Sequence, residues 1–300
     1  MTGLDAQPDH ERLAALWPVG TYLRVEQWAP PSLDGDQDPA RLRSRVPVDA
    51  HLVDEAGGLH AGALLTAVDA LGGYLSGLAV QPDGIVTTSM ALRVGRRRHV
   101  GPLLCEATVL RKGRASVVTL VSVADEGDGG AAVASCVMTC AVLRRESSAP
   151  TLGRPVHHPM APARPDPVPL HEFFGVQLGP GPVTRLQIGD HLRNNWSILH
   201  GGAIAVLSDL AAVRAVRSPG PTLLGEAPPV ALFSTGAPPA ALSSTDMVLH
   251  YLAPARVGPV EARCTVMGAR PDGTVVRAAL YDTGVNDRMV ALASVTVRPA

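Results

Sequence analysis

The sequence predicts an α+β protein made of two similar domains in tandem, each with one long helix packed against a curved antiparallel sheet. Two observations predict this duplication. The segment 59–71 returns as 199–211, 140 positions later, with Leu, His, Gly, Ala and Asp in step. The segment 87–102 returns as 244–259 at a constant offset of 157. A repeat of this length is too long for a solenoid and indicates a duplicated domain.

The chain divides into four predicted parts, which are a lead-in (1–40), a first domain (41–146), a Pro-rich linker (147–170) and a second domain (171–300). The composition of the linker is typical of extended polyproline. Its adjacent His157 and His158 fit a solvated linker better than a metal site. The insertion 218–241 holds six prolines and three glycines. It is predicted to be a loop that serves as a lid or as an oligomer contact.

The helices are predicted over 61–80 and 201–217, which are apolar on nearly every face and rich in small residues that let a sheet wrap closely. Asp69 and a pair of glycines interrupt the first of them, so it is predicted to be buried rather than to span a membrane. Strands rich in β-formers are expected in the same order in each repeat. They are 41–48, 86–94, 103–111, 115–124 and 132–143, and then 182–188, 246–252, 260–267, 274–281 and 290–297.

The composition narrows the classes of partner. The 300 residues are 46% hydrophobic and 18% charged, and the formal net charge is -1. No basic field covers such a chain, so we expect no nucleic-acid partner and no membrane. The four cysteines show no metal-binding spacing and are predicted to pack in the core. The N-terminal segment has early acids and no apolar core, so it is not a secretory signal and a cytoplasmic location is expected.

A His and an Asp stand nine positions apart at the start of each predicted helix, as His60 with Asp69 and His200 with Asp209. A carboxylate on an apolar helix is costly to bury unless it has a task or a partner. A carboxylate at such a position can activate water or attack a carbonyl carbon. The free N–H groups of a helix start can stabilise the resulting oxyanion. We therefore favour a catalytic role for these Asp residues over a structural role in capping backbone groups or pairing with Arg.

This pattern resembles the hotdog fold and, more narrowly, the phenylacetate-pathway (PaaI-like) acyl-CoA thioesterases, over most of both repeats. The family pattern is Asn-x5-His-Gly-Gly-Ala-x5-Asp, followed by a Ser or Thr near the start of the next strand. Repeat two matches it with Asn194, His200, Gly201, Gly202, Asp209 and Ser244, and departs at Ser197, where the family usually has Gly. Repeat one matches with His60, Gly62, Asp69 and Thr87, but has Asp54 in place of the Asn and Ala61 in place of the first Gly.

The resemblance implies two unequal sites, each built from both repeats. Nine residues of helix rise about 13 Å, so no helix brings its own Asp back to its start. In hotdog dimers of this type the helices run antiparallel, and each Asp meets the other His-Gly end. The first implied site joins Asn194, His200 and Gly201 to Asp69 and Thr87, and the second joins Asp54, His60 and Ala61 to Asp209 and Ser244.

In the first implied site every role is filled. Asp69 would act as base or nucleophile, Asn194 would orient water, and the Gly201 N–H, oriented by His200, would stabilise the oxyanion. In the second site two carboxylates would face each other, so we expect it to be degenerate. Gly202 and Gly62 would let the substrate approach the backbone closely.

Positive charge is concentrated in repeat one, in Arg96, Arg97 and Arg98 and, on the adjoining strand, in Arg111, Lys112 and Arg114. We expect one clamp there for the phosphates of coenzyme A, with a solvated strand end as an equal alternative. The favoured function is hydrolysis of an acyl-CoA without a metal or redox cofactor.

Three alternatives stay open at this stage. A hotdog enoyl-CoA hydratase would need an Asp and a His close together near the helix start, for which only Asp49 and Asp190 are candidates. A non-catalytic acyl-CoA-binding protein would usually lack the helix Asp. The double-hotdog medium-chain acyl-CoA thioesterases place their acid differently. The oligomeric state is left open, with a homo-oligomer of such chains as one outcome.

Overall fold

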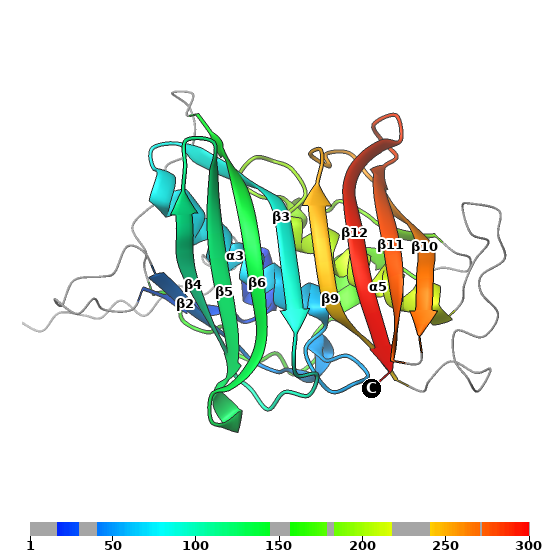
Figure 1. Ribbon diagram of the computed structural model, residues 1–300, viewed down its shortest axis with the longest axis horizontal. Coiled ribbons are helices and arrows are strands. Elements are labelled where there is room, and N and C mark those ends of the chain that lie inside the picture. The colour runs from blue at the N-terminus through cyan, green and yellow to red at the C-terminus, as the bar shows by residue number, and fades with distance from the viewer. Residues whose placement is uncertain are drawn as a thin grey trace, which may run out of the picture.

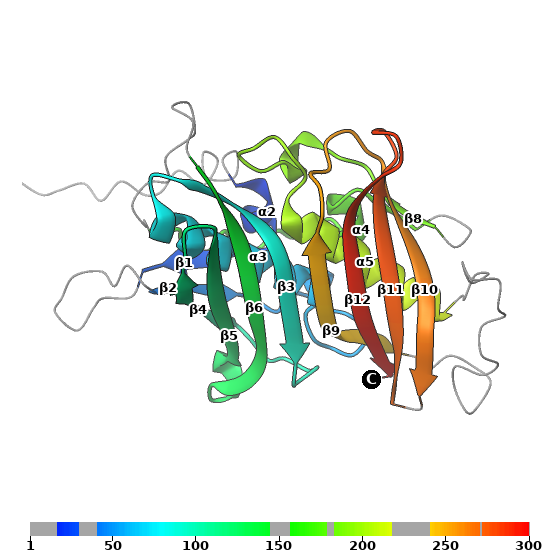
Figure 2. The same cartoon turned by 45° about the horizontal axis from the view of Figure 1, so that its top comes forward.

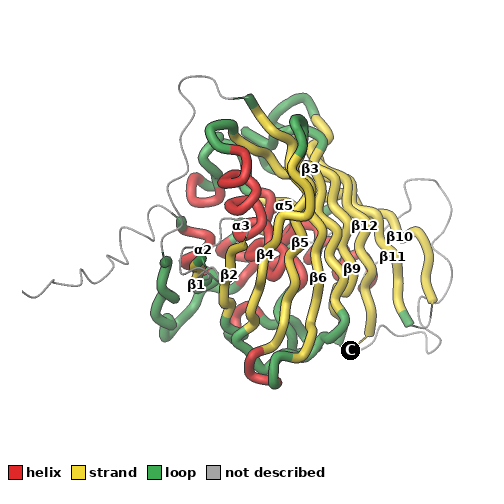
Figure 3. Tube along the Cα trace, turned by 60° about the vertical axis from the view of Figure 1, so that its left-hand side comes forward, coloured by secondary structure: helices red, strands yellow, loops and turns green. Residues whose placement is uncertain are grey.

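The computed structural model describes residues 17–29, 41–144, 157–178, 183–217, 241–270 and 272–299. Twelve strands form one continuous, curved antiparallel sheet, and two long helices lie on one face of it (Figures 1 and 3). The helices are α3 (Ala61–Val80) and α5 (Gly201–Arg217), so both match their predicted bounds. Most of the 20 residues of α3 are buried, which makes this apolar helix a core helix of the fold.

Counted inward from either edge, the sheet has equivalent strands in the same order. Its order is β1-β2-β4-β5-β6-β3-β9-β12-β11-β10-β8-β7. The first half contains β1 (Glu26–Trp28), β2 (Arg41–Val46), β3 (Gly84–Val94), β4 (Leu103–Lys112), β5 (Ser116–Asp125) and β6 (Ala131–Leu143). The second half contains β7 (Val176–Gln177), β8 (Thr184–Leu186), β9 (Leu242–Tyr251), β10 (Val260–Arg270), β11 (Gly273–Asp282) and β12 (Arg288–Pro299). Each strand of one half therefore has a counterpart in the other.

The two halves join where β3 pairs with β9. The central pair in this register is Ala91 with Val248, which are equivalent positions at the 157 offset. Steps in either direction then give symmetry-related pairs: Ser89 pairs with His250, and their counterparts Asp246 and Arg93 pair with each other. A pseudo-twofold axis therefore passes through the Ala91–Val248 pair, and the duplicated chain folds as its own symmetric partner.

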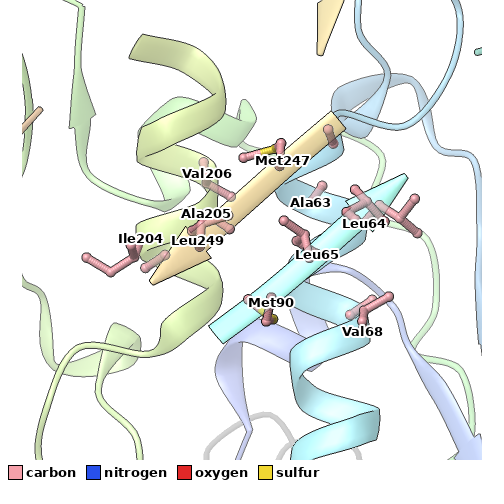
Figure 4. Close-up of a cluster of buried hydrophobic side chains, with 14 of the residues drawn as sticks. Ala63, Leu64, Leu65, Val68, Met90, Ile204, Ala205, Val206, Met247 and Leu249 are labelled. Carbon is pink, nitrogen blue, oxygen red and sulfur yellow. The ribbon is translucent and has the colours of Figure 1, made fainter. Parts of the chain in front are cut away.

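One core runs beneath this seam. Leu65, Val68 and Met90 from the first half meet Ala205, Met247 and Leu249 from the second, and all are buried (Figure 4). The four cysteines lie in or against this interior. Three are fully buried and Cys264 is half-buried, and all four are free thiols, as packing residues should be.

Short elements cover the helix side of the sheet. Helix α2 (Pro18–Tyr22) and helix α4 (Leu170–Phe173) both lie on this side (Figure 2). The rings of Tyr22 and Phe173 stack, with their centroids 3.7 Å apart. In the linker, the ring of His157 contacts Glu26 at 2.9 Å and the backbone of His158 pairs with Gln27. The predicted domain boundaries stay predictions, and all of the insertion 218–241 except its last residue lies outside the described residues.

Candidate functional site

A turn before each long helix positions the histidine that precedes it. In repeat two the Asn194 Oδ1 accepts hydrogen bonds from the N–H groups of Trp196, at 2.9 Å, and Ile198, at 3.4 Å. In repeat one Asp54 makes the same two bonds, to Ala56 and Gly58. The side-chain Oδ1 of either Asn or Asp can accept these two bonds, so both repeats form the same turn.

The departure at Ser197 has a structural consequence. Ser197 adopts a φ of 55°, and its counterpart Gly57 has a φ of 85°. This left-handed conformation favours glycine, so repeat two holds a strained serine directly before its site.

The first site lies across the seam, between α3 and the start of α5. Asp69 Oδ1 accepts a 2.8 Å hydrogen bond from the Thr87 hydroxyl, and Asp69 Oδ2 lies 3.7 Å from His200 Nδ1. A methyl group on Gly201 would come within 2.7 Å of the same Oδ2. The structure therefore brings Asp69, Thr87, His200 and Gly201 together, and only glycine leaves space at position 201.

The second site is its counterpart between α5 and the start of α3. Asp209 Oδ1 accepts a 2.6 Å hydrogen bond from the Ser244 hydroxyl. Asp209 Oδ2 accepts a 2.9 Å bond from the Gly62 N–H and lies 3.5 Å from His60 Nδ1. The Asp209 side chain is 2% exposed, against 8% for Asp69.

The two carboxylates differ in how many donors hold them. Among the hydrogen bonds of the described residues, Asp69 receives only the Thr87 hydroxyl, and its Oδ2 accepts none. In this site the Gly202 N–H instead donates to His200 Nδ1 at 2.9 Å, so the neutral His200 carries its proton on Nε2. Both oxygens of Asp209 are occupied. Asp69 is therefore the carboxylate with an oxygen available to a ligand.

The helix starts supply open backbone donors at both sites. Within the described residues, no hydrogen bond uses the N–H of Gly201 or of Ala61, the first residue of each helix. Such N–H groups carry the partial positive charge of the helix dipole. Each site can therefore receive a carbonyl oxygen or an oxyanion at this point.

The electrostatics of the second site follow from two facing carboxyl groups. Burial and the charge of Asp209 raise the pKa of Asp54 to about 6. Burial alone would lower the pKa of His60, but the hydrogen bond with Asp209 and its charge outweigh burial and raise it. Burial would likewise raise the pKa of Asp209, but the contacts of His60, Ser244 and Gly62 lower it. This site therefore holds a stabilised carboxylate, which is a weak base.

A cavity of about 390 Å³ opens at the second site. Asp54, His60, Asp209 and Ser244 line one end of it. From there it follows α5 toward the C-terminal end of that helix, past Leu210 and Val213. This volume is within the range of small-molecule sites.

Tyr251 is part of the first site, although no sequence pattern pointed to it. Its hydroxyl donates a 2.9 Å hydrogen bond to the Gly201 carbonyl, and burial together with the charge of Asp69 raises its pKa well above the ordinary value. The counterpart in repeat one is Val94. Nothing in the sequence singles out this unequal pair, because many neighbouring positions of the two segments also differ.

Two further carboxylates support the loops that carry the sites. Asp125 accepts bonds from the N–H groups of Val100 and Gly101. Asp282, its counterpart at the 157 offset, accepts four such bonds, from Arg256, Val257, Gly258 and Gly284. A recurring Asp-x-Gly at this offset could have identified them.

The expectation of a single arginine clamp is wrong, because its two groups lie at opposite ends of β4. Arg96, Arg97 and Arg98 belong to the loop before β4, and the Arg97 carbonyl packs against Gly58, beside the second site. Arg111 and Lys112 end β4, and Arg114 follows them, about 30 Å away at 3.3 Å a residue. Lys112 shares a row of the sheet with Val117, Cys140 and Thr87. Lys112 is therefore three strands away from Thr87 in this row, at the end of the sheet opposite to Arg96, Arg97 and Arg98.

The remaining candidates lie elsewhere. Asp49 pairs with Arg24 at 2.7 Å, and the Asp190 side chain is fully exposed beside Arg193. Neither approaches a His at a helix start in the manner of a hydratase. Within the described ranges, no group of three or more His, Cys, Asp or Glu side chains is arranged to hold a metal ion.

Comparison with known proteins relates this geometry to a family. The sequence model of the thioesterase superfamily matches residues 56–132 and 197–287, which contain both His-Asp pairs. No curated protein matches the chain.

Several solved structures share the fold at low sequence identity. The tesB protein of Mycobacterium avium subspecies paratuberculosis is 12% identical with a TM-score of 0.56, covering 94% of this chain and 97% of that one. A hot dog fold protein of Alicyclobacillus acidocaldarius is 13% identical with a TM-score of 0.52, at 94% and 97% coverage. An acyl-ACP thioesterase of Bacteroides thetaiotaomicron is 12% identical with a TM-score of 0.51, at 86% and 98% coverage. The tandem hotdog fold predicted from the repeats is thereby confirmed.

Proposed function

We propose, from the premise that this chain belongs to the thioesterase superfamily and hydrolyses thioester bonds, that its substrate is an acyl-coenzyme A and its working carboxylate is Asp69. The observation that carries the assignment is the contrast between the two Asp residues. Asp69 keeps one oxygen without a donor, 3.7 Å from His200 and against the Gly201 backbone. Asp209 has both oxygens bound.

The chemistry at the first site needs no group beyond these. The thioester carbonyl oxygen receives the Gly201 N–H, which stabilises the negative charge that develops as the carbonyl is attacked. Asp69 Oδ2 takes the proton of the attacking water, or attacks the carbonyl itself and is released by water in a second step. In the first route the C–S bond breaks as the tetrahedral intermediate collapses, and the leaving thiolate takes the proton held by Asp69. In the second route the C–S bond breaks as the anhydride with Asp69 forms, before water cleaves that anhydride, and the thiolate is protonated from solvent. The products of both routes are the free acid and the thiol of coenzyme A.

The neighbouring side chains hold these reacting groups in place. Thr87 fixes the rotamer of Asp69 through Oδ1. His200 Nδ1 accepts the Gly202 N–H and holds the start of α5. Asn194 uses its Oδ1 for the turn, which leaves its amide NH₂ as the group that orients water.

The proposal also includes the residues that bind coenzyme A and the subgroup of thioesterases to which the protein belongs. Arg111, Lys112 and Arg114, at the end of the sheet that holds Thr87, bind the phosphates of coenzyme A at the first site. The Asn-x5-His-Gly-Gly-Ala-x5-Asp pattern supports a place in the phenylacetate-pathway (PaaI-like) group. We propose a cytoplasmic enzyme that needs no metal or redox cofactor.

A thiol-release assay on short, long and aromatic acyl-CoAs tests this function. We expect Asp69→Asn to lower kcat/KM by at least about a thousandfold, the effect of removing a group essential to the reaction. Asp209→Asn should keep most of the activity of the wild type. Full activity in Asp69→Asn with loss in Asp209→Asn would reverse the assignment, and no thiol release from any acyl-CoA by the wild type would refute the substrate class.

A further inference from the structure

The cavity at the second site is built for a ligand, although its carboxylate is poorly suited to hydrolysis. Ser244 and Gly62 occupy the two oxygens of Asp209, and His60 lies 3.5 Å from one of them. A carboxylate held by these donors is a weak base and a weak nucleophile. Ala61, directly after His60 of the cavity wall, has an N–H that no hydrogen bond among the described residues uses, and this N–H can receive a carbonyl oxygen.

The walls of the cavity change in character along α5. Next to Asp209 they are apolar, formed by Leu210 and Val213 of the helix and by Leu178 and Leu242 opposite. Farther along lie Arg214 and Arg217, together with Glu55, whose carboxylate pairs with Arg217. Arg214 is five residues beyond Asp209, so it lies about 7.5 Å along the helix axis.

The cationic end is a property of this site and not of the fold. The counterparts of Arg214 and Arg217 in α3 are Tyr74 and Gly77, which carry no positive charge at neutral pH. Arg217 forms an ion pair with Glu55. Arg214 NH1 donates a 2.8 Å bond to the Leu178 carbonyl, which fixes the direction of its guanidinium in the cavity wall.

We infer that the second site binds, without hydrolysing, an acyl compound that has a neutral carbonyl group at one end and an anionic group at the other. The carbonyl oxygen accepts the Ala61 N–H. The acidic pair of Asp54 and Asp209 excludes a carboxylate at that end, because like charges would be buried together. The methylene chain lies on the leucines and Val213, and the distal carboxylate meets Arg214.

Two neutral-headed amides test this inference, because an amide keeps the carbonyl and resists hydrolysis. Suberic acid monomethylamide carries a distal carboxylate, and N-methyloctanamide has the same chain without it. We expect calorimetric titration to show at least about tenfold tighter binding of the first, because a hydrogen bond to a charged group is stronger than one between neutral groups. Equal affinities, or binding of neither compound, would overturn the inference.

Variants assign the effect to the cavity. Arg214→Gln should remove most of the preference for the carboxylate while leaving N-methyloctanamide unchanged. Tyr74→Phe, at the matching position of α3, should change neither affinity. A preference that survives Arg214→Gln, in a variant whose thermal unfolding matches the wild type, contradicts the assignment.

The same titration in Asp69→Asn separates this inference from the proposed function. Binding should persist there, because Asp69 belongs to the other site. Persistent binding without any thiol release by the wild type would refute the proposed function alone. Thiol release without a carboxylate preference would refute the inference alone.

Discussion

Thr66 of α3 and Gly202 of α5 meet where the two long helices cross. The single proton of the Thr66 hydroxyl is shared between the Gly62 carbonyl of its own helix, at 2.7 Å, and the Gly202 carbonyl, at 3.1 Å. The counterpart contact brings Gly62 against the backbone of Val206. Both sites are positioned by this crossing, because each pairs the start of one helix with the Asp of the other.

A side chain at either glycine should separate the helices. A methyl group on Gly62 would lie 2.6 Å from the Val206 Cα, and one on Gly202 would lie 2.4 Å from a Thr66 side-chain carbon. Backbone atoms can move away from a clash less easily than side-chain atoms. We therefore expect Gly62→Ala to lower the free energy of unfolding by about 3 kcal/mol and Gly202→Ala by about 1–2 kcal/mol. Urea unfolding measures both.

Gly73→Ala is the matched control for these two variants. No atom lies within 4 Å of a methyl group at position 73. Alanine should therefore stabilise α3 by up to about 1 kcal/mol through helix propensity. A similar loss of stability in all three variants would show that the crossing is not what requires glycine.

Asp282→Ala should weaken the first site more than Asp125→Ala does. Asp282 holds the loop whose Ala255 carbonyl accepts the Leu199 N–H, directly before His200. Its loss leaves four N–H groups without their acceptor, and we expect about 2–4 kcal/mol of destabilisation together with reduced thiol release. Asp125→Ala removes two such bonds beside the second site and should leave kcat closer to the wild type. Equal kcat values in the two variants would contradict this division.

The stability of both loops should depend on acid pH. Burial would raise the pKa of Asp282, but its four backbone hydrogen bonds lower it below the ordinary value. A carboxyl group with a lowered folded pKa stabilises the protein above its unfolded pKa, near 3.9, and this contribution disappears as the pH falls through the folded value. The difference in unfolding free energy between wild type and Asp282→Ala should therefore shrink toward pH 2.

Asp54→Asn should stabilise the protein at neutral pH. The pKa of Asp54 is raised to about 6, so its ionisation disfavours folding above that pH. Asparagine keeps the turn, as Asn194 shows in repeat two. We expect a gain of about 1–2 kcal/mol at pH 8, less than the roughly 3 kcal/mol of the full shift because the side chain is partly solvated. The gain should vanish below pH 4, where the wild-type carboxyl is protonated in both states. Constant stabilisation across this range would exclude the carboxylate pair as its cause.

The regular elements of this fold could be predicted because their patterns are long. Both helices begin directly after a His and are apolar throughout, so Ala61–Val80 and Gly201–Arg217 were predictable to the residue. β9 begins at Leu242 rather than at 246, because Ser243, Ser244 and Thr245 are polar and nevertheless buried. The edge strands β1 and β7 have three and two residues, too few for any alternation to show.

The sites were less predictable, since side-chain placement depends on contacts between distant segments. The arginine clamp is an exception, because the predicted strand 103–111 already separates Arg97 from Arg111 and counting its residues would have excluded the clamp. The repeat did not show that two equivalent N–H groups have different acceptors. The Gly62 N–H donates to Asp209, whereas the Gly202 N–H donates to His200.

Tyr251 should matter to turnover at the first site more than to folding. Its hydroxyl donates a hydrogen bond to the Gly201 carbonyl. A methyl group on Gly201 would lie 3.3 Å from this hydroxyl oxygen and 2.7 Å from Asp69 Oδ2, so the three groups are close together. Because its pKa is raised by burial and by the Asp69 charge, the hydroxyl stays a donor across the usual assay range. Tyr251→Phe keeps the ring and removes this hydrogen bond from the helix start that receives the oxyanion. We expect kcat to fall about tenfold, or about 1.4 kcal/mol in the barrier, with unfolding free energy changed by about 1 kcal/mol or less. Loss of stability with unchanged kcat would make Tyr251 a packing residue only.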